Sequence, residues 1–241
     1  MHELPDTLSI APPRYGVLGA LLGKALFNCR RLTGRHRYDR FAIEWVQGLP
    51  FIIIPGVFNP RVLRTGAFFA SQLDTDLVTS ETRVLDMGTG SGVCAVVAAK
   101  RARRVVAVDI NAAAARCARI NALANHVEDR VDVRHGDLFA PVAGERFDLI
   151  LFNPPFIRGV PKDARDCAWR SPDAVQRFAA ALTQHLNPGG YALVLLSTFG
   201  DAADFAREFA ASGLQVAPFA EREYINERIS ILKVTAGSVA P

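Results

Sequence analysis

The feature that most constrains the fold is a regular alternation of short apolar runs with helical stretches over most of the chain. Apolar runs with few charges are typical of strands buried on both faces, and strands that alternate with helices build a parallel sheet covered on both sides. The strands are predicted near residues 83–87, 105–108, 131–134, 147–152, 191–197, 214–219 and 228–235, with helices in the gaps. The sequence therefore predicts an α/β fold with a seven-stranded, mostly parallel sheet and helices on both faces.

The part of the chain before these strands has a different pattern. The residues that recur at helical spacing, and so predict an amphipathic helix, are Leu18, Leu22, Ala25, Cys29 and Leu32. Phe41, Ile43 and Trp45 then share one face of a period-two segment, and the apolar run 51–54 completes a predicted β-hairpin. A helix near residues 66–73 leads into the sheet. Because 241 residues suit one large domain, we expect a small appendage over residues 1–60 and a main domain over residues 61–241.

The clearest helix of the main domain follows the second strand. It begins after Asn111, a residue type that caps helix N-termini well. We expect the buried face of this alanine-rich helix to contain Ala113, Cys117, Ile120 and Ala124.

The composition excludes several classes of protein. Half of the residues are hydrophobic and the net charge is +4, so the chain can bury a core and tolerates an anionic partner without requiring one. The four cysteines lack a CxxC pair, so we expect neither a disulfide framework nor a metal site. The first residues lack the pattern of a secretory signal, and the uncharged stretch 178–200 is interrupted by an Asn-Pro-Gly-Gly turn. We therefore expect a cytoplasmic protein without membrane contact.

A strand, a glycine-rich turn and a helix follow one another at VLDMGTGSG, residues 84–92. Gly88, Gly90 and Gly92 let a ligand approach the backbone closely and let amide groups point at it. Asp86 lies near the end of this strand, and a second acid, Asp109, ends the next strand about 20 residues on, where a carboxylate can accept hydrogen bonds from both ribose hydroxyls. The pattern therefore predicts a nucleoside cofactor.

The departures from the dinucleotide-binding pattern indicate which cofactor this is. The third small residue of G-x-G-x-x-G is replaced by Val93, while Gly92 comes one residue early. Asp86 would also repel a pyrophosphate, whereas it suits a ligand with a cationic amino group. NAD is therefore disfavoured.

A second motif lies at the end of the fourth strand, where FDLILF runs into Asn153, Pro154, Pro155 and Phe156. Ligands of such sheets bind in the crevice at the carboxyl ends of the strands. A strand that merely stops at two prolines is the simpler interpretation, but the preceding glycine turn and the two acids favour a functional one.

The glycine turn resembles motif I of the class I S-adenosylmethionine-dependent methyltransferases, which have a Rossmann-like fold. The resemblance implies that Asp86 lies near the methionine amino end of S-adenosylmethionine, Asp109 on the ribose and Ile110 against the adenine. In GDLF, Asp137 would bind the adenine amine beside Leu138. The residues implied in cofactor binding are Thr65, Asp86, Gly88, Thr89, Gly90, Gly92, Asp109, Ile110, Asp137, Leu138 and Asn153.

The NPPF segment is similar to the NPPY/F motif of methyltransferases that modify planar nitrogens. In an amide or aromatic amine the lone pair is delocalised, so methyl transfer requires the nitrogen to be re-hybridised. Acceptors at the Asn153 side-chain oxygen and the Pro154 carbonyl could take both N–H groups and orient the lone pair, which is catalysis by positioning and electrostatics. Pro155 would stiffen this backbone, and Phe156 would stack on the planar target.

Within this class the chain resembles the HemK-like family of protein glutamine methyltransferases and the related small-domain group that acts on RNA. The similarity covers about residues 41–197, and Thr65 would match a family hydroxyl at the cofactor lip, although extra residues separate it from Pro60. The family implies a protein glutamine amide as substrate, as in release-factor methyltransferases. Only about 40 residues precede the hairpin here, fewer than in the bacterial members.

Other substrates and functions stay open. A base amine of RNA or DNA is favoured by a basic cluster with His36 and Tyr38 between its members, which are Arg30, Arg31, Arg35, Arg37 and Arg40. The long segment 158–173, with Trp169 and Arg170, is a candidate specificity loop. A small-molecule nitrogen and a non-catalytic cofactor-binding module are the remaining alternatives.

Overall fold

A computed structural model describes residues 40–60, 64–162, 166–224 and 227–237. The chain divides into two compact units, one made of His36–Asn153 with Gln184–Gly190 and the other including Pro154–Thr183 and Tyr191–Pro241. The predicted N-terminal helix, and every arginine of the basic cluster except Arg40, lie outside the described residues. The predicted domain boundary at residue 60 stays a prediction.

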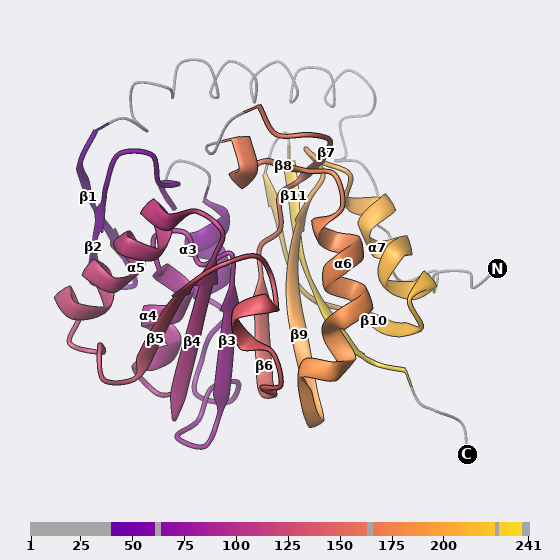
Figure 1. Cartoon of the computed structure of the whole chain (residues 1–241), viewed down its shortest axis with the longest axis horizontal. Helices are drawn as coiled ribbons and strands as arrows, with labels where there is room; N and C mark the ends of the chain where they lie inside the picture. Colours follow the sequence, from indigo (N-terminus) through magenta and orange to yellow (C-terminus); the bar gives the residue numbers. More distant parts are fainter. Residues whose placement is uncertain (1–39, 61–63, 163–165, 225–226, 238–241) are drawn as a thin grey trace. The chain divides into compact units, whose positions relative to one another are not determined.

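The first unit contains the parallel strands β3 (Arg83–Met87), β4 (Arg104–Asp109), β5 (Val131–His135) and β6 (Phe147–Phe152). Their order is β6-β3-β4-β5 (Figure 1). Helices α3 (Thr65–Ala70), α4 (Val93–Ala99) and α5 (Ala112–Ala124) accompany them. Between β5 and β6 the prediction of a helix was wrong, because the short connection holds only the 3₁₀ turn η1 (Ala140–Val142).

The other unit contains most of β9 (Leu186–Ser197) and the long antiparallel pair β10 (Leu214–Tyr224) and β11 (Glu227–Ala236). Its helices are α6 (Ala174–Ala181) and α7 (Ala202–Ala211), and the 3₁₀ turn η3 (Leu182–His185) follows α6. The segment after NPPF forms the two-residue strands β7 (Ile157–Arg158) and β8 (Arg170–Ser171) with the 3₁₀ turn η2 (Asp166–Ala168).

The strands of the main sheet are hydrogen-bonded in the order β10-β11-β9-β6-β3-β4-β5. The predicted α/β fold with a seven-stranded, mostly parallel sheet is therefore confirmed. The turn predicted at residues 187–190 was wrong, because these residues belong to β9; the Asn187 side chain donates to Asp148 and helps to hold the strand there. In the described part of the chain, no helix has the length and apolar character needed to cross a membrane.

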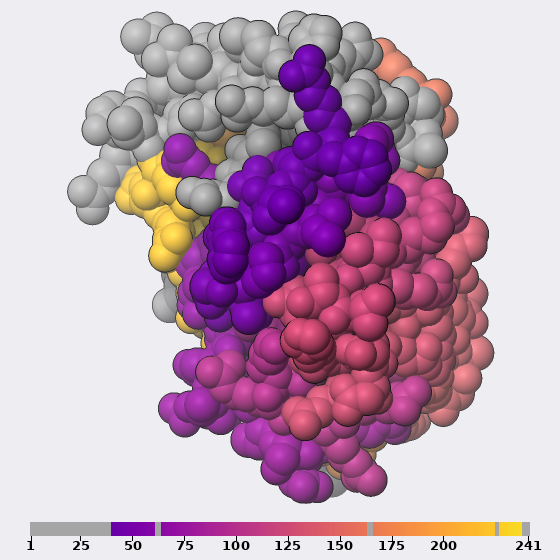
Figure 2. Space-filling model, turned by 90° about the vertical axis from the view of Figure 1, so that its left-hand side faces the viewer, coloured from indigo at the N-terminus to yellow at the C-terminus, as the bar shows by residue number. Residues whose placement is uncertain are grey.

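The predicted hairpin is confirmed as the separate two-stranded sheet of β1 (Ala42–Val46) and β2 (Leu49–Ile53). Val46, Phe51 and Ile53 are buried. On the opposite face Phe41, Ile43 and Trp45 are 74%, 67% and 59% exposed. Figure 2 shows the hairpin, in indigo, at the surface of this side of the molecule.

Helix α5 has the predicted cap but a different buried face. The Asn111 side chain accepts from the Ala113 N–H, as an N-cap does. Cys117 is buried as expected, but Ile120 is 39% exposed and the inward positions are taken by Ala114, Ala115, Cys117, Ala118, Asn121 and Ala122. The physical reason is that Asn121 points inward to bond with the backbone of the hairpin.

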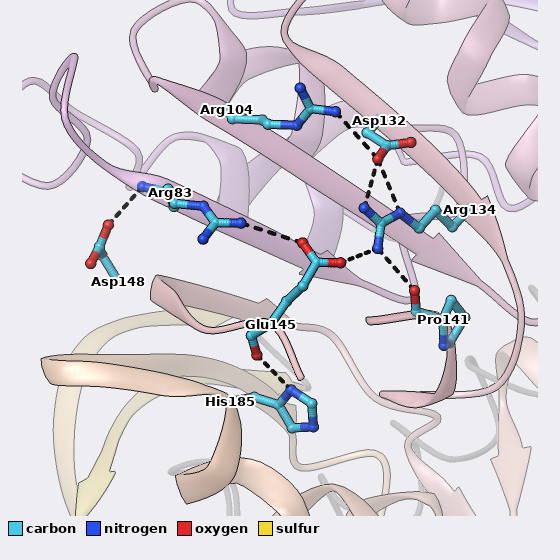
Figure 3. A network of polar contacts seen from close by, with 8 residues as sticks. All are labelled: Arg83, Arg104, Asp132, Arg134, Pro141, Glu145, Asp148 and His185. Atoms are coloured by element: carbon cyan, nitrogen blue, oxygen red, sulfur yellow. Dashed lines mark hydrogen bonds and ion pairs between the residues drawn. The ribbon is translucent and has the colours of Figure 1, made fainter. Parts of the chain in front are cut away.

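A network of charged residues links strands β3, β4 and β5 with the segment before β6 (Figure 3). Arg134 binds Asp132 at 2.8 Å and also pairs with Glu145, while Arg83 reaches Glu145 at 3.3 Å and Arg104 reaches Asp132 at 3.4 Å. Burial raises the pKa of Asp132, but the hydrogen bonds and charges of Arg134 and Arg104 together outweigh it and hold this pKa below its usual range. The network thus fastens β3, β4 and β5 to the start of β6.

Candidate functional site

The carboxyl ends of three neighbouring strands coincide, and this brings the predicted motifs together. Met87, the last residue of β3, pairs with Val108 of β4 and with Phe152, the last residue of β6. The residues that follow are therefore neighbours: a Cβ placed on Gly88 would lie 4.0 Å from the Asn153 carbonyl oxygen. The structure thus places the glycine turn beside the start of NPPF.

The glycine turn adopts a backbone that requires glycine at three positions. Gly88, Gly90 and Gly92 have φ values of 68°, 57° and 83°, and the amides of Gly88 and Thr89 donate to the Val108 carbonyl at 2.8 and 3.0 Å. A Cβ on Gly90 would meet no atom within 4 Å, whereas one on Gly92 would lie 2.9 Å from Ala118 Cα. Gly90 therefore faces open space that a ligand can fill, Gly88 lies against the Asn153 carbonyl, and Gly92 packs the turn closely against α5.

Asp86 lies beneath this turn and braces it. Its Oδ2 accepts from Thr89 Oγ1 at 2.6 Å and from the Ala95 amide of α4 at 3.0 Å. Burial raises the pKa of Asp86 to about 6; the two hydrogen bonds oppose the rise and the charge of Asp109 adds to it. A cationic group near Asp86 would stabilise its ionised form. The predicted contact with the methionine amino group stays a prediction.

Asp109 ends β4 and faces the turn with both oxygens. Oδ2 accepts from the Gly90 amide and Oδ1 from the Asn111 amide, each at 2.8 Å. Burial raises the pKa of Asp109, while these amides and the charge of His135 lower it. Each oxygen retains a further lone pair that could accept a ribose hydroxyl. The adjacent Ile110 is 55% exposed, so its side chain is available to cover an apolar ring.

The GDLF segment follows β5 next to Asp109. The Gly136 amide donates to the Asp109 carbonyl at 3.0 Å, which places Asp137 and Leu138 directly after this contact. Leu138 has a positive φ of 45°, a strained conformation for a side chain of this type. Asp137 and Leu138 are both half-buried. Their predicted contacts with adenine are not tested by this geometry.

Among the described residues of this unit, two buried polar side-chain atoms have no hydrogen-bond partner within the described part of the chain. They are the Asn153 side-chain Oδ1 and the hydroxyl of Thr65, the first residue of α3. Buried acceptors and donors without partners are rare in folded proteins and require an explanation. Both atoms belong to residues predicted to bind cofactor or substrate, so the set fits a ligand that brings hydrogen-bonding groups of its own.

The remaining NPPF residues belong to the other compact unit and are described within it. Pro154 is buried and Pro155 is half-buried. Phe156 is also buried; its ring lies 6.5 Å from that of Trp169, tilted by 59°, and its carbonyl accepts from the Asp201 amide. Trp169, expected in a surface loop, is only 7% exposed and packs there instead. Stacking of Phe156 on a substrate stays a prediction.

Sequence reasoning missed Asn121, which contacts both the hairpin and the glycine turn. A signal was present, because an asparagine follows Cys117 by four residues and so shares the inner stripe of the helix. A polar residue at such a position must find buried partners. Its partners could not be read from the sequence, since Ile52 lies 69 residues away.

The sheet, the glycine turn at the end of β3 and the acid at the end of β4 define an α/β protein of the nucleoside-cofactor-binding class. A sequence model of the family described as "Methyltransferase small domain" matches residues 48–213. The chain belongs to this methyltransferase family. The prediction of a class I methyltransferase is therefore confirmed, and the expected cofactor is S-adenosylmethionine.

Two curated relatives are similar over most of the chain. The chain is 33% identical to "Ribosomal protein uL3 glutamine methyltransferase" of Bradyrhizobium diazoefficiens, over 61% of this chain and 52% of the relative. It is 35% identical to "Ribosomal RNA small subunit methyltransferase C" of Escherichia coli, over 67% of this chain and 44% of the relative. The chain thus spans about half the length of these relatives.

Solved structures share the fold. A Thermus thermophilus 16S rRNA N2 G1207 methyltransferase, crystallised with S-adenosylmethionine and guanosine, matches with a TM-score of 0.60 at 20% identity, over 82% of this chain and 50% of that chain. A ribosomal protein L11 methylase from Lactobacillus delbrueckii matches with a TM-score of 0.56 at 21% identity, over 76% of this chain and 83% of that chain. The Rossmann-like methyltransferase fold is therefore confirmed.

Proposed function

We propose that this chain is an S-adenosylmethionine-dependent N-methyltransferase that acts on a planar nitrogen of a macromolecule. The observation that carries the proposal is the buried Oδ1 of Asn153, which has no hydrogen-bond partner among the described residues. The carbonyl of the same residue lies beside Gly88. A buried acceptor at this edge of the sheet is suited to an N–H donor from a substrate.

The residues of the chain have distinct tasks in this proposal. S-adenosylmethionine supplies an activated methyl group on its sulfonium. Gly90 leaves space for it, Asp109 accepts the ribose hydroxyls and Thr65 provides a hydroxyl. Asn153 and the carbonyl of the next residue, Pro154, would accept the N–H groups of the substrate and so orient the nitrogen lone pair without a strong base. After methylation the nitrogen would lose one N–H proton to water, and S-adenosylhomocysteine would be the leaving group.

A protein glutamine amide is the first candidate substrate. Its NH₂ group is planar and offers two N–H donors, which matches a pair of oxygen acceptors. A relative named as a glutamine methyltransferase is 33% identical to this chain, and its printed target is a ribosomal protein. The release-factor target implied by the family resemblance has no such support from the relatives named above.

An exocyclic base amine of RNA is the second candidate. It too is a planar nitrogen with two N–H groups, and relatives named as ribosomal RNA methyltransferases are 35% identical to the chain. The specific observation in its favour is the exposed aromatic pair Phe41 and Trp45 next to Arg40, the end of an arginine-rich stretch of sequence. Exposed aromatic and cationic groups together suit single-stranded nucleic acid.

The substrate class can be tested by transfer of labelled methyl groups from S-adenosylmethionine in a cell extract. After the reaction, one half is treated with protease and the other with nuclease. Label that is lost with protease supports the glutamine, and label lost with nuclease supports the base amine, for which RNA affinity should also fall with added salt. The absence of transfer to any macromolecule would contradict the proposal.

Replacement of Asn153 by alanine tests the catalytic part of the proposal. We expect Asn153→Ala to lower turnover by roughly a hundredfold, as loss of one preorganised polar group does, while the Kd of S-adenosylmethionine changes little. Single-turnover kinetics and calorimetric titration measure the two effects. An unchanged turnover would remove Asn153 from the mechanism, and a wild-type protein that binds the cofactor without any turnover would favour a non-catalytic module.

A further inference from the structure

A single amide side chain links the hairpin to the glycine turn. Asn121 of α5 is fully buried. Its Oδ1 accepts from the Ile52 amide at 2.7 Å, and its Nδ2 donates to the Ile52 carbonyl at 2.8 Å. The side chain thus pairs with both backbone groups of Ile52, as a neighbouring strand would.

The same amide group also reaches the turn. Nδ2 donates to the Ser91 carbonyl at 2.8 Å, in a contact that is buried. Ser91 lies between Gly90, whose amide binds Asp109, and Gly92, which touches α5 at Ala118. Because Ala118 and Asn121 are one helical turn apart, they hold adjacent residues of the turn from the same face of α5.

We propose that Asn121 is a positioning residue for the cofactor turn. Two fixed points, the Ser91 carbonyl and the Gly92 Cα, leave the turn little freedom to rotate, so the Gly90 amide stays on the Asp109 carboxylate. Without Asn121 the Ser91 carbonyl loses this donor and the Ile52 amide of β2 loses its acceptor, whereas the Ile52 carbonyl keeps the Cys117 thiol at 3.2 Å. We therefore predict that replacing Asn121 weakens cofactor binding even under conditions in which the variant is fully folded.

Asn125, the residue that caps the carboxyl end of α5, offers a matched control. It is also a buried asparagine, and its Nδ2 donates to the Pro50 carbonyl of β2 and to the Asn121 carbonyl, each at 2.9 Å. It holds the hairpin by a similar bond, but its recorded side-chain bonds do not include the glycine turn. A comparison of the two positions therefore separates support of the hairpin from support of the turn.

The experiment compares wild type, Asn121→Ala, Asn121→Ser and Asn125→Ala. Calorimetry gives the Kd of S-adenosylmethionine, circular dichroism gives the thermal midpoint, and hydrogen exchange reports the amides of residues 90–92. We expect about tenfold weaker binding and faster exchange for both Asn121 variants, equivalent to about one lost hydrogen bond, and less than a twofold change in Kd for Asn125→Ala.

Two results would overturn the proposal. One is a folded Asn121 variant that binds S-adenosylmethionine and exchanges the amides of residues 90–92 as the wild type does. The other is an Asn125→Ala protein that loses as much cofactor affinity as the Asn121 variants. If Asn121→Ala does not fold, Asn121→Ser still answers the question, because its uncharged hydroxyl can satisfy one buried partner but is too short to bridge Ile52 and Ser91. If the wild type itself does not bind S-adenosylmethionine, the proposed function fails, whereas the exchange of the turn amides still tests Asn121.

Discussion

Asp86 should give the unliganded protein a measurable pH dependence. Its folded pKa of about 6 lies above the ordinary value of 3.8, so between these values the folded state binds more protons than the unfolded state. Its contribution to stability is therefore complete below pH 3.8 and is lost as the pH rises through about 6. We expect the free energy of unfolding to fall by about 1 kcal/mol from pH 5 to pH 7 on this account.

Urea denaturation of wild type and Asp86→Asn at pH 5, 6 and 7 measures this effect. From pH 5 to pH 7 the free energy of unfolding of the wild type should fall relative to that of Asp86→Asn. The contributions of the other carboxyls cancel in this comparison. Parallel pH profiles would refute the assignment to Asp86. A cationic ligand beside Asp86 favours its ionised form, so binding of S-adenosylmethionine should weaken below pH 6 although the unliganded protein becomes more stable.

Gly92 is the glycine of the turn that should tolerate substitution least. An alanine there would combine a φ of 83° with a contact of 2.9 Å to Ala118 Cα, and the backbone of α5 cannot easily move. The matched control is Gly144→Ala, with a similar φ of 78° and no atom within 4 Å. We expect both to lose about 1 kcal/mol from the backbone conformation, and Gly92→Ala to lose a further 1–3 kcal/mol, roughly, from overpacking.

Denaturant unfolding of both variants checks this expectation. If both variants lost the same free energy of unfolding, α5 would have moved to accommodate the added methyl group, and the close packing at Ala118 would not limit substitution at Gly92. The comparison is informative because both glycines lie in the same compact unit.

Residues whose roles depend on local sequence could be predicted, whereas those that depend on distant partners could not. The three glycines and Asp109 were recognisable because a strand, a turn and a helix fix their spacing. The bonds from Asn121 to Ile52 and from Arg134 to Glu145 join segments that no local pattern connects. The burial of Trp169 against Phe156 was missed for the same reason.

At the scale of elements, the charged network should stabilise the parallel strands. Arg134 is its centre, since it pairs with both Asp132 and Glu145. About a quarter of its side chain is exposed, so solvent screens these pairs and we expect Arg134→Gln to cost about 1 kcal/mol of unfolding free energy. Urea unfolding at low and high salt measures this cost.

The salt dependence provides the control for that prediction. The difference in free energy of unfolding between wild type and Arg134→Gln should become smaller at high salt. Arg207→Gln removes an exposed ion pair within α7 and should change the free energy of unfolding little. A loss for Arg134→Gln that does not depend on salt would point to packing of the side-chain stem rather than to charge.

Element boundaries were predictable where residues that end strands are present. The bounds of β3 and β6 were predicted correctly, because glycine follows one and Asn-Pro-Pro follows the other. The start of β9 was not predicted correctly, because residues 187–190 are part of the strand, where Asn187 is held by Asp148, even though Gly189 has a φ of 78°. The inner face of α5 was missed because Asn121 and Asn125 bind the hairpin, leaving Ile120 outside.

At the scale of the whole molecule, cofactor binding should raise thermal stability. A ligand that binds only the folded state adds about 2.7 kcal/mol at 100 times its Kd, which for a chain of this length corresponds to a shift of about 5–10 °C. We expect this shift with S-adenosylmethionine and none with NAD, by circular dichroism at matched concentrations. An equal shift with NAD would contradict the interpretation of the glycine turn.

The two tryptophans of the chain lie in contrasting environments. Trp45 is largely exposed on the hairpin, and Trp169 is buried against Phe156. We therefore expect their fluorescence to be separable, with Trp169 emitting at shorter wavelength and shielded from acrylamide, and Trp45 emitting at longer wavelength and readily quenched. A Trp45→Phe protein reports on one compact unit and a Trp169→Phe protein on the other, so the chain carries a natural optical probe in each.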